Sequence, residues 1–230
     1  MSMPFRLVKW FGLVKWVKVR VLVFPVDACQ LSLDSDTAHP RLCLFDNNTV
    51  TDEDEDQPYA KKEDCFLSWY QVLCSDSLRR RCYWEVAWMG SVSVGVGVAY
   101  SGIRRTGRGE ESILGGKACS WTLDCSADHY CAWHQNKGIS VQQPVPDGAG
   151  GRVGLYLDWS AGTISFCGVS SDRPEHIHTF YCSFTEPVYP AFRIRSRFTH
   201  GCCNSVCLCP MDQDETHSDT DDGWKTHSIC

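Results

Sequence analysis

The fold is decided by residues 81–100, which read RCYWEVAWMGSVSVGVGVAY. In the second half of this stretch, valine occupies every other position from Val92 to Val98, and the residues between are serine or glycine. In the first half, Trp84, Val86 and Trp88 alternate with less apolar residues in the same way. A period of two places alternate side chains on opposite faces of a strand. We therefore predict two strands here, each with one apolar face turned toward a core.

A third alternation predicts a β-hairpin further along the chain. Val153, Leu155 and Leu157 share one face, and Asp158–Gly162 separates them from a second strand at Thr163–Phe166. Gly162 would supply the positive φ that a short turn needs. We find no amphipathic helix longer than about three turns. Short strands at close spacing, separated by turn residues, predict an all-β fold that is a sandwich or a barrel.

Length, charge and motifs narrow the function classes. A chain of 230 residues with 43% hydrophobic content can bury a sizeable core. Its net charge is −6, whereas a nucleic-acid binder normally needs clustered basic surface, so we expect no nucleic acid partner. Hydrolase, Walker and zinc-protease motifs are absent, so we expect no enzyme and no cofactor. Gly95 and Gly97 lie within an alternating strand, and we interpret them as residues that allow close sheet packing.

The two ends of the chain differ from the middle. Residues 1–26 carry five basic side chains and no acid, and lysines interrupt their apolar runs. A membrane span needs about 20 apolar residues, so we expect neither an export signal nor an anchor. Two interpretations stay open: a leader or extra edge strand, and a segment that lies on an anionic membrane. Membrane contact is expected, if at all, only through this segment.

Two acidic segments are poor in apolar residues. Residues 210–230 hold six acids against one lysine, and residues 52–56 read DEDED. Like charges repel, and a short polar segment cannot offset its ordering entropy. We predict a disordered tail at 210–230 and a solvated loop at 52–56, with an interaction role as the alternative for both. The folded domain is then expected to span residues 27–209.

Fifteen cysteines raise the question of whether they are bridged, metal-bound or free. Their number is odd, and no pair has the C-x-x-C spacing typical of zinc sites, so we expect no metal. Several stand in apolar patterns, such as Cys167 after Phe166, where a free thiol acts as a small hydrophobe. We therefore predict predominantly reduced cysteines, a domain that survives reduction, and a cytoplasmic location.

Several motifs that occur in one order resemble those of the B30.2 (PRY-SPRY) family. They are Leu31–Pro40 (LSLDSDTAHP), Cys82–Trp88 (CYWEVAW), Ser120–Asp124 (SWTLD), Trp133–Lys137 (WHQNK), Val153–Asp158 (VGLYLD) and Phe184–Pro190 (FTEPVYP). The resemblance covers about residues 26–209. Residues 102–109 are similar to the version that is common in bony fishes.

The resemblance implies a bent sandwich of two antiparallel sheets that binds proteins, as in tripartite-motif ubiquitin ligases, butyrophilins, fish NOD-like receptors and stonustoxin-like proteins. We expect a non-catalytic recognition module in innate immune or ubiquitin-ligase-linked recognition. Any ligase activity would need a RING module, which these residues do not contain. The alternative is the terminal part of a stonustoxin-like membrane-active protein.

The resemblance also implies where a partner binds, because ligands in this family dock on loops and strand ends at one end of the sandwich. Here that end would gather the loop Ser101–Lys117, residues 131–134 and residues 193–198. If residues 193–197 are extended, three arginines project from one face as a basic stripe. The alternative is an ordinary solvated strand face.

The candidate partner-binding residues are Arg104, Arg105, Arg108, Cys131, Trp133, His134, Arg193, Arg195 and Arg197. Arginine and tryptophan are enriched at interface hot spots, so we expect an acidic protein partner.

Overall fold

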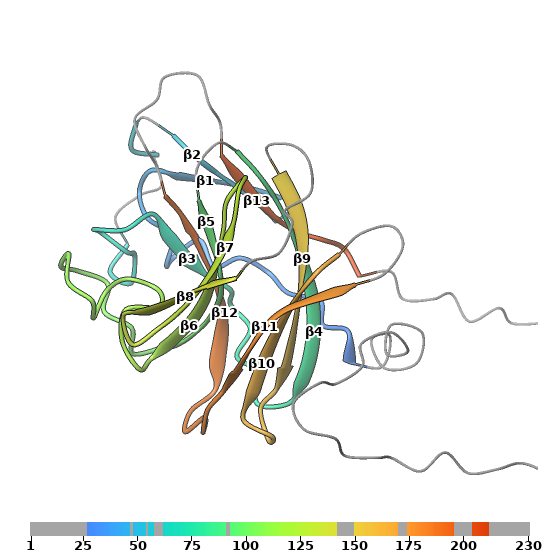
Figure 1. Cartoon of the computed structure of the whole chain (residues 1–230). Helices are drawn as coiled ribbons and strands as arrows, with labels where there is room; N and C mark the ends of the chain where they lie inside the picture. The colour runs from blue at the N-terminus through green and yellow to red at the C-terminus, as the bar shows by residue number, and fades with distance from the viewer. Residues whose placement is uncertain are drawn as a thin grey trace, which may run out of the picture.

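The computed structural model describes residues 27–46, 48–53, 55–57, 62–90, 93–141, 150–169, 174–195 and 204–211. Within these ranges every secondary-structure element is a strand, and the strands form two antiparallel sheets around a shared core (Figure 1). The prediction of an all-β antiparallel sandwich is confirmed. In this part of the chain, no helix has the length and apolar character needed to span a bilayer. The predicted leader, and the predicted tail from residue 212 onward, lie outside the described residues.

The larger sheet has seven strands in the order β1-β2-β13-β4-β9-β10-β11. They are β1 (Leu42–Phe45), β2 (Thr49–Asp52), β4 (Arg81–Met89), β9 (Gly150–Asp158), β10 (Thr163–Gly168), β11 (Glu175–Tyr181) and β13 (Ser205–Leu208). β9 and β10 form the predicted hairpin, and Gly162 in its turn has a φ of 69°. β13, the last described strand, lies between β2 and β4, so it ties the end of the domain to its beginning.

The smaller sheet has six strands in the order β3-β12-β5-β6-β7-β8. They are β3 (Gln71–Leu73), β5 (Val94–Tyr100), β6 (Ser120–Cys125), β7 (Tyr130–His134), β8 (Lys137–Val141) and β12 (Val188–Ile194). β12 pairs with both β3 and β5, so residues far apart in sequence lie side by side.

The core forms where the apolar faces of the two sheets meet. Val94, Val96 and Val98 of β5 are fully buried, as the alternation predicts. They belong to one apolar cluster with Trp84 of β4 and Leu155 of β9, which come from the opposite sheet. The stretch that alternates most regularly in the sequence therefore supplies both sides of the core.

The outer face of β4 is also buried, which the alternation does not predict. Tyr83 and Glu85 are 2% and 6% exposed. The Tyr83 hydroxyl donates a hydrogen bond of 2.6 Å to Glu85, and Nε of Arg152 lies 2.6 Å from the same carboxylate. Polar side chains can be buried when they are paired in this way. The sequence shows the polar residues but not the partners that cover them.

The loop between β5 and β6 packs on the outer face of the six-stranded sheet, the face turned away from the core. Ile103 and Leu114 from this loop join a small apolar cluster with Ala99 of β5 and Ala191 of β12. This second cluster holds the loop against the sheet rather than leaving it in solvent.

One disulfide departs from the expectation of free thiols. Cys29 and Cys82 are bonded to each other. The backbone of Cys29 pairs with that of Tyr83, which brings the two sulfurs together, although 53 positions separate them in the sequence. The sequence offered no signal for this pairing, because it depends on the packing of residue 28 against β4. The other ten described cysteines are not in disulfide bonds.

Thiol counting on unfolded protein tests the disulfide. Without reductant, wild type and the Cys29→Ser/Cys82→Ser double variant should give the same count, because the bonded pair does not react. With reductant, wild type should exceed the variant by two thiols per chain. A wild-type excess of two that is already present without reductant would contradict the bond.

Candidate partner-binding site

A pocket of about 860 Å³ opens on the outer face of the six-stranded sheet. Asp56 and four segments form it: residues 39–41, residues 67–70, the β5–β6 loop and residues 193–195 at the end of β12. We call it the outer-face pocket. Its lining residues are His39, Pro40, Arg41, Asp56, Leu67, Ser68, Trp69, Tyr70, Arg108, Ile113, Arg193, Ile194 and Arg195.

A row of side chains crosses the sheet at the base of this pocket. In the strand register, Arg193 of β12 pairs with Gln71 of β3 on one side and with Gly95 of β5 on the other. Gly95 pairs with Asp124 of β6, which in turn pairs with Cys131 of β7. Paired residues on neighbouring antiparallel strands point to the same face. The register therefore places an arginine and an aspartate on one face with only a glycine between them.

Arg193 and Asp124 form a buried ion pair across Gly95. Nη2 of Arg193 lies 2.6 Å from Oδ1 and 2.7 Å from Oδ2 of Asp124. Both side chains are nearly inaccessible, at 6% and 7% exposed. A Cβ added at Gly95 would lie 3.0 Å from Oδ1 of Asp124 and 3.3 Å from Cβ of Arg193. The glycine thus leaves the space through which the two charges meet.

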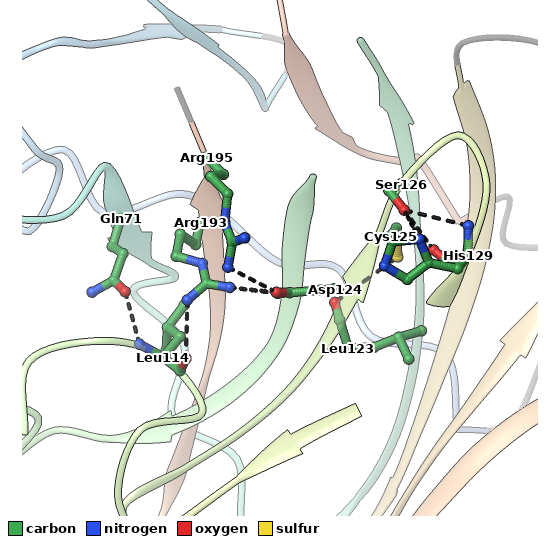
Figure 2. A network of polar contacts seen from close by, with 9 residues as sticks. All are labelled: Gln71, Leu114, Leu123, Asp124, Cys125, Ser126, His129, Arg193 and Arg195. Carbon is green, nitrogen blue, oxygen red and sulfur yellow. Dashed lines mark hydrogen bonds and ion pairs between the residues drawn. The ribbon is translucent and has the colours of Figure 1, made fainter. Parts of the chain in front are cut away.

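The same row anchors the β5–β6 loop (Figure 2). Gln71 accepts at Oε1 from the Leu114 amide at 2.8 Å, as Figure 2 shows. Its Nε2 donates to the Ser112 carbonyl at 2.9 Å. Nη1 of Arg193 donates to the Leu114 carbonyl at 3.3 Å. Trp69 adds a bond from Nε1 to the Ser112 hydroxyl at 3.2 Å. Buried side chains therefore fix the backbone of the loop at Ser112 and at Leu114.

Removing the amide of Gln71 should loosen this loop without unfolding the domain. In Gln71→Met, the Leu114 amide and the Ser112 carbonyl lose their partner, at a cost of about 1–3 kcal/mol. Trypsin should then cut after Arg104, Arg105 or Arg108 several-fold faster than in wild type, well below the melting temperature. Cleavage after Arg80, outside the loop, is the internal control and should not change. Equal cleavage of the loop in the two proteins would show that Gln71 does not hold it.

Among the arginines that line the pocket, Arg195 and Arg108 have the weakest contacts with carboxylates. The side chain of Arg195 is 51% exposed, and its Nη2 approaches Asp124 only to 3.6 Å, beyond normal hydrogen-bonding distance. Arg108 is exposed and has no ion pair among the described residues. Arg41 differs from both, because its Nε lies 3.3 Å from Asp56.

Three aromatic side chains, His39, Trp69 and Tyr70, line part of the pocket, and we call them the aromatic wall. The rings of His39 and Tyr70 stack with centroids 4.3 Å apart. Nδ1 of His39 accepts a hydrogen bond of 3.1 Å from the Arg41 amide. Burial, reinforced by the positive charge of Arg41, lowers the pKa of His39 to about 4. His39 is therefore neutral at physiological pH and contributes a stacking surface rather than a charge.

The predicted basic stripe is wrong for Arg193. Arg193 is 5% exposed and neutralised by Asp124, whereas Arg195, two residues later, is half exposed. The alternation correctly placed both on one face, but it could not show that Asp124 and the β5–β6 loop cover the first. Arg197 lies outside the described residues, and its predicted role stays a prediction.

The other two predicted arginines of the loop differ in role. The side chain of Arg104 is exposed, and its Nη1 lies 3.8 Å from Glu111. Arg105 donates to the Asp64 carbonyl at 2.9 Å and to the Ile103 carbonyl at 2.7 Å. Its guanidinium also lies 4.6 Å from the ring centroid of Phe66. Arg105 therefore holds the loop to the preceding segment, and neither residue lines the outer-face pocket.

The predicted residues of β7 point in two directions. Cys131 and Trp133 lie on the outer face, in register with Asp124 and Thr122. His134 lies on the core face, where it stacks on Trp121 at 4.9 Å and contacts the Ser120 carbonyl at 2.9 Å through Nδ1. The structure thus separates His134 from the arginines, because consecutive strand residues face opposite ways. Trp133 lies over Gly138 of β8 and not in the pocket.

Sequence analysis missed the half of the pocket formed by residues before β4. His39 was noted only within the LSLDSDTAHP motif, and Arg41, Trp69 and Tyr70 were not singled out. A Trp-Tyr pair between polar residues is a weak signal alone. These residues meet Arg195 only because β3 pairs with β12.

A Ser, His and Asp cluster in the β6–β7 turn does not have the geometry of a catalytic triad. The hydroxyl of Ser126 and Oδ1 of Asp128 both contact Nδ1 of His129, at 3.0 and 2.6 Å (Figure 2 shows the serine contact). In a triad the serine hydroxyl and the carboxylate bond different nitrogens of the histidine ring. This cluster stabilises the turn. Nor does any group of three or more His, Cys, Asp or Glu side chains within the described ranges have an arrangement that could hold a metal.

Comparisons with known proteins place the chain in a family. The model of the SPRY domain matches residues 81–209, and that of the SPRY-associated domain, PRY, matches residues 31–78. The chain belongs to the SPRY family. The two matches together make the B30.2 architecture, and they confirm the resemblance on which the sequence analysis relied. SPRY domains generally bind protein partners and are typically non-catalytic.

Similar proteins include a toxin and a tripartite-motif protein. Stonustoxin subunit alpha of Synanceia horrida is 40% identical over 177 residues, which are 76% of this chain and 25% of the subunit. Tripartite motif-containing protein 16 of Mus musculus is 37% identical over 168 residues, 72% of this chain and 29% of that protein. The chain therefore spans less than a third of each relative. The crystal structure of the TRIM65 PSpry domain shares the fold, with a TM-score of 0.72 over 92% of this chain and 100% of that chain at 21% identity.

The outer-face pocket lies where the PRY and SPRY segments of this SPRY chain meet. His39, Trp69 and Tyr70 belong to the PRY match, and Arg108 and Arg195 belong to the SPRY match. The aromatic wall and the free cations therefore come from different segments. The pocket exists only when both segments pack together.

Proposed function

We propose that this chain is a non-catalytic recognition module that binds a protein partner at the outer-face pocket and the surface around it. The observation that carries the proposal is that two weakly paired arginines line one pocket in a chain of net charge −6. Arg108 has no ion pair among the described residues, and Arg195 only approaches Asp124, to 3.6 Å. Arginine forks and aromatic walls are the groups enriched at interface hot spots. The partner is acidic where it meets these arginines.

The proposal gives the predicted residues different roles, according to their burial and contacts. Arg108 and Arg195 bind the partner directly, and Arg104, Cys131 and Trp133 lie on the surrounding surface. Arg193, Arg105 and His134 position the surface from within, because the first is buried in an ion pair, the second holds the loop and the third faces the core.

The cellular setting forms part of the proposal. The likeness to a tripartite-motif protein supports recognition linked to innate immunity or to ubiquitin ligation. Ten cysteines of the described residues are outside disulfide bonds, which favours a reducing compartment such as the cytoplasm. No nucleic acid partner is proposed, because net negative charge opposes binding to phosphates.

Partner capture followed by charge reversal tests the function. Once a binder is found by pull-down, Arg108→Glu with Arg195→Glu should weaken it by about tenfold or more, since each lost contact at a hot spot is worth more than about 1 kcal/mol. Raising the salt concentration should weaken wild-type binding in the same direction. Arg80→Glu, an exposed charge reversal outside the pocket, is the matched control. If wild type, the double variant and Arg80→Glu bound the partner with equal affinity, the binding surface would lie elsewhere.

The second candidate function is that of a terminal part of a stonustoxin-like membrane-active protein. The 40% identity to stonustoxin subunit alpha favours it. A liposome pull-down with and without residues 1–26 separates it from the first. Sedimentation with anionic vesicles that requires residues 1–26 would favour the membrane role, and sedimentation of neither protein would count against it.

A further inference from the structure

The four arginines of the outer-face pocket differ in how firmly they are held. Arg193 makes two bonds shorter than 3 Å to Asp124 and a third bond to the loop backbone. Arg41 is paired with Asp56. Nη2 of Arg195 lies 3.6 Å from Oδ2 of Asp124, farther than the contacts of Arg193 with the same carboxylate. Arg108 has no carboxylate partner in the described part of the chain. Asp124 is already bound by Arg193 from both oxygens, so Arg195 can leave it at little cost.

The surface beside the free arginines is apolar and held in place. Leu67 lines the pocket and is 51% exposed, so it offers an apolar surface to a ligand there. Trp69 is tied to Ser112, and Tyr70 is stacked on His39. A ligand group that contacts this wall therefore meets side chains that are already ordered, and binding loses little conformational entropy there.

Negative charge at the pocket limits how many acids a ligand can carry. Asp56 lines the pocket and follows the acidic residues 52–55 in the chain. A polyanion would meet this half-exposed carboxylate, whose charge Arg41 offsets only in part across solvent, as well as Arg108 and Arg195. A ligand with one carboxylate and an apolar neighbour satisfies the cations and covers the wall without that repulsion.

We propose that the outer-face pocket binds one Asp or Glu side chain of a protein segment whose adjacent residue is aromatic or aliphatic. Arg195 turns from Asp124 to the incoming carboxylate, Arg108 adds a second cation, and Arg193 stays fixed as the residue that positions Asp124. The apolar neighbour packs against Leu67 and the aromatic wall. This inference rests on the proposed function and names the chemistry of the partner.

Selection from a displayed library of random dodecapeptides tests the inference on the whole chain. Peptides enriched on wild type should share one acid beside an aromatic or large aliphatic residue, and polyacidic peptides should not be enriched. A selected peptide made with Gln for its Glu, or Asn for its Asp, should bind at least about tenfold more weakly, because a buried carboxylate–guanidinium contact is lost. Arg195→Ala should show the same loss for the acidic peptide and little further loss for its amide version. Arg80→Ala is the control and should bind like wild type.

Several results would overturn the inference. An empty selection, enriched peptides without an acid, or equal binding to wild type and Arg195→Ala would each exclude a carboxylate subsite at this pocket. Enrichment of polyacidic peptides whose binding disappears at moderate salt would show general attraction instead. These outcomes leave protein recognition intact if pull-down still captures a partner. Failure of the proposed function is a different result, in which the Arg108→Glu/Arg195→Glu variant retains its captured protein.

Discussion

Asp124→Ala should lower the free energy of unfolding by about 3–5 kcal/mol, because it leaves the charge of Arg193 buried without a partner. Arg193 is 5% exposed and makes its two shortest contacts with this carboxylate. Loss of either member of a buried pair costs more than loss of both. Replacing both charges, in Arg193→Met with Asp124→Leu, should therefore recover most of the stability.

Urea titration of wild type, the single variant and the double variant measures this difference. The double variant still lacks the bond from Arg193 to the Leu114 carbonyl, so its loop should be cut by trypsin faster than that of wild type. If the double variant were less stable than Asp124→Ala, burial of an unpaired charge would not be the reason for the loss.

Trp84→Ala should also cost about 3–5 kcal/mol, because it removes the largest fully buried side chain of β4 and leaves a cavity between the sheets. Trp84 is 1% exposed and belongs to the cluster that joins both sheets. Tyr181→Ala, at a position that is 74% exposed, is the matched aromatic control and should change stability by less than about 1 kcal/mol. Similar losses for the two variants would mean that Trp84 does not lie in the core.

The fold could be predicted from the sequence because its strands carry their pattern locally. The valines of β5 and the alternation in β4 each indicate a buried face, and Gly162 marks a hairpin turn without reference to the rest of the chain. What the sequence could not show is the burial of Tyr83 and Glu85, since their partners lie on β9 and in residues before β1. The Cys29–Cys82 bond was missed for the same reason.

The candidate site was predicted less well than the fold. Alternation placed Arg193 and Arg195 on one face, but their different roles follow from Asp124, which reaches Arg193 across Gly95. Sequence separation hid the contribution of Arg41, Trp69 and Tyr70. These residues become part of the pocket through long-range pairing of β3 with β12, which no local pattern encodes.

The register of β5, β6 and β12 leads in three steps to the arginines of the outer-face pocket. Gly95 permits a buried ion pair, the ion pair and Gln71 fix the β5–β6 loop, and the fixed loop brings Arg108 to the pocket that Arg195 and the aromatic wall also line. The first two steps are contacts between described residues, and the third is the shared lining of one pocket. The step from this surface to a protein partner is the proposal.

Site-specific photo-crosslinking tests directly whether a protein partner binds at the outer-face pocket. A photoreactive side chain in place of Leu67, at the outer-face pocket, is compared with the same group in place of Met89, which is 61% exposed at the end of β4 in the other sheet. If a protein partner binds at the outer-face pocket, position 67 should give a covalent adduct with a captured protein, and position 89 should give none. The adduct from position 67 should be lost when Arg108→Glu and Arg195→Glu are added. An adduct that forms from position 89 and not from position 67 would show that the partner binds elsewhere.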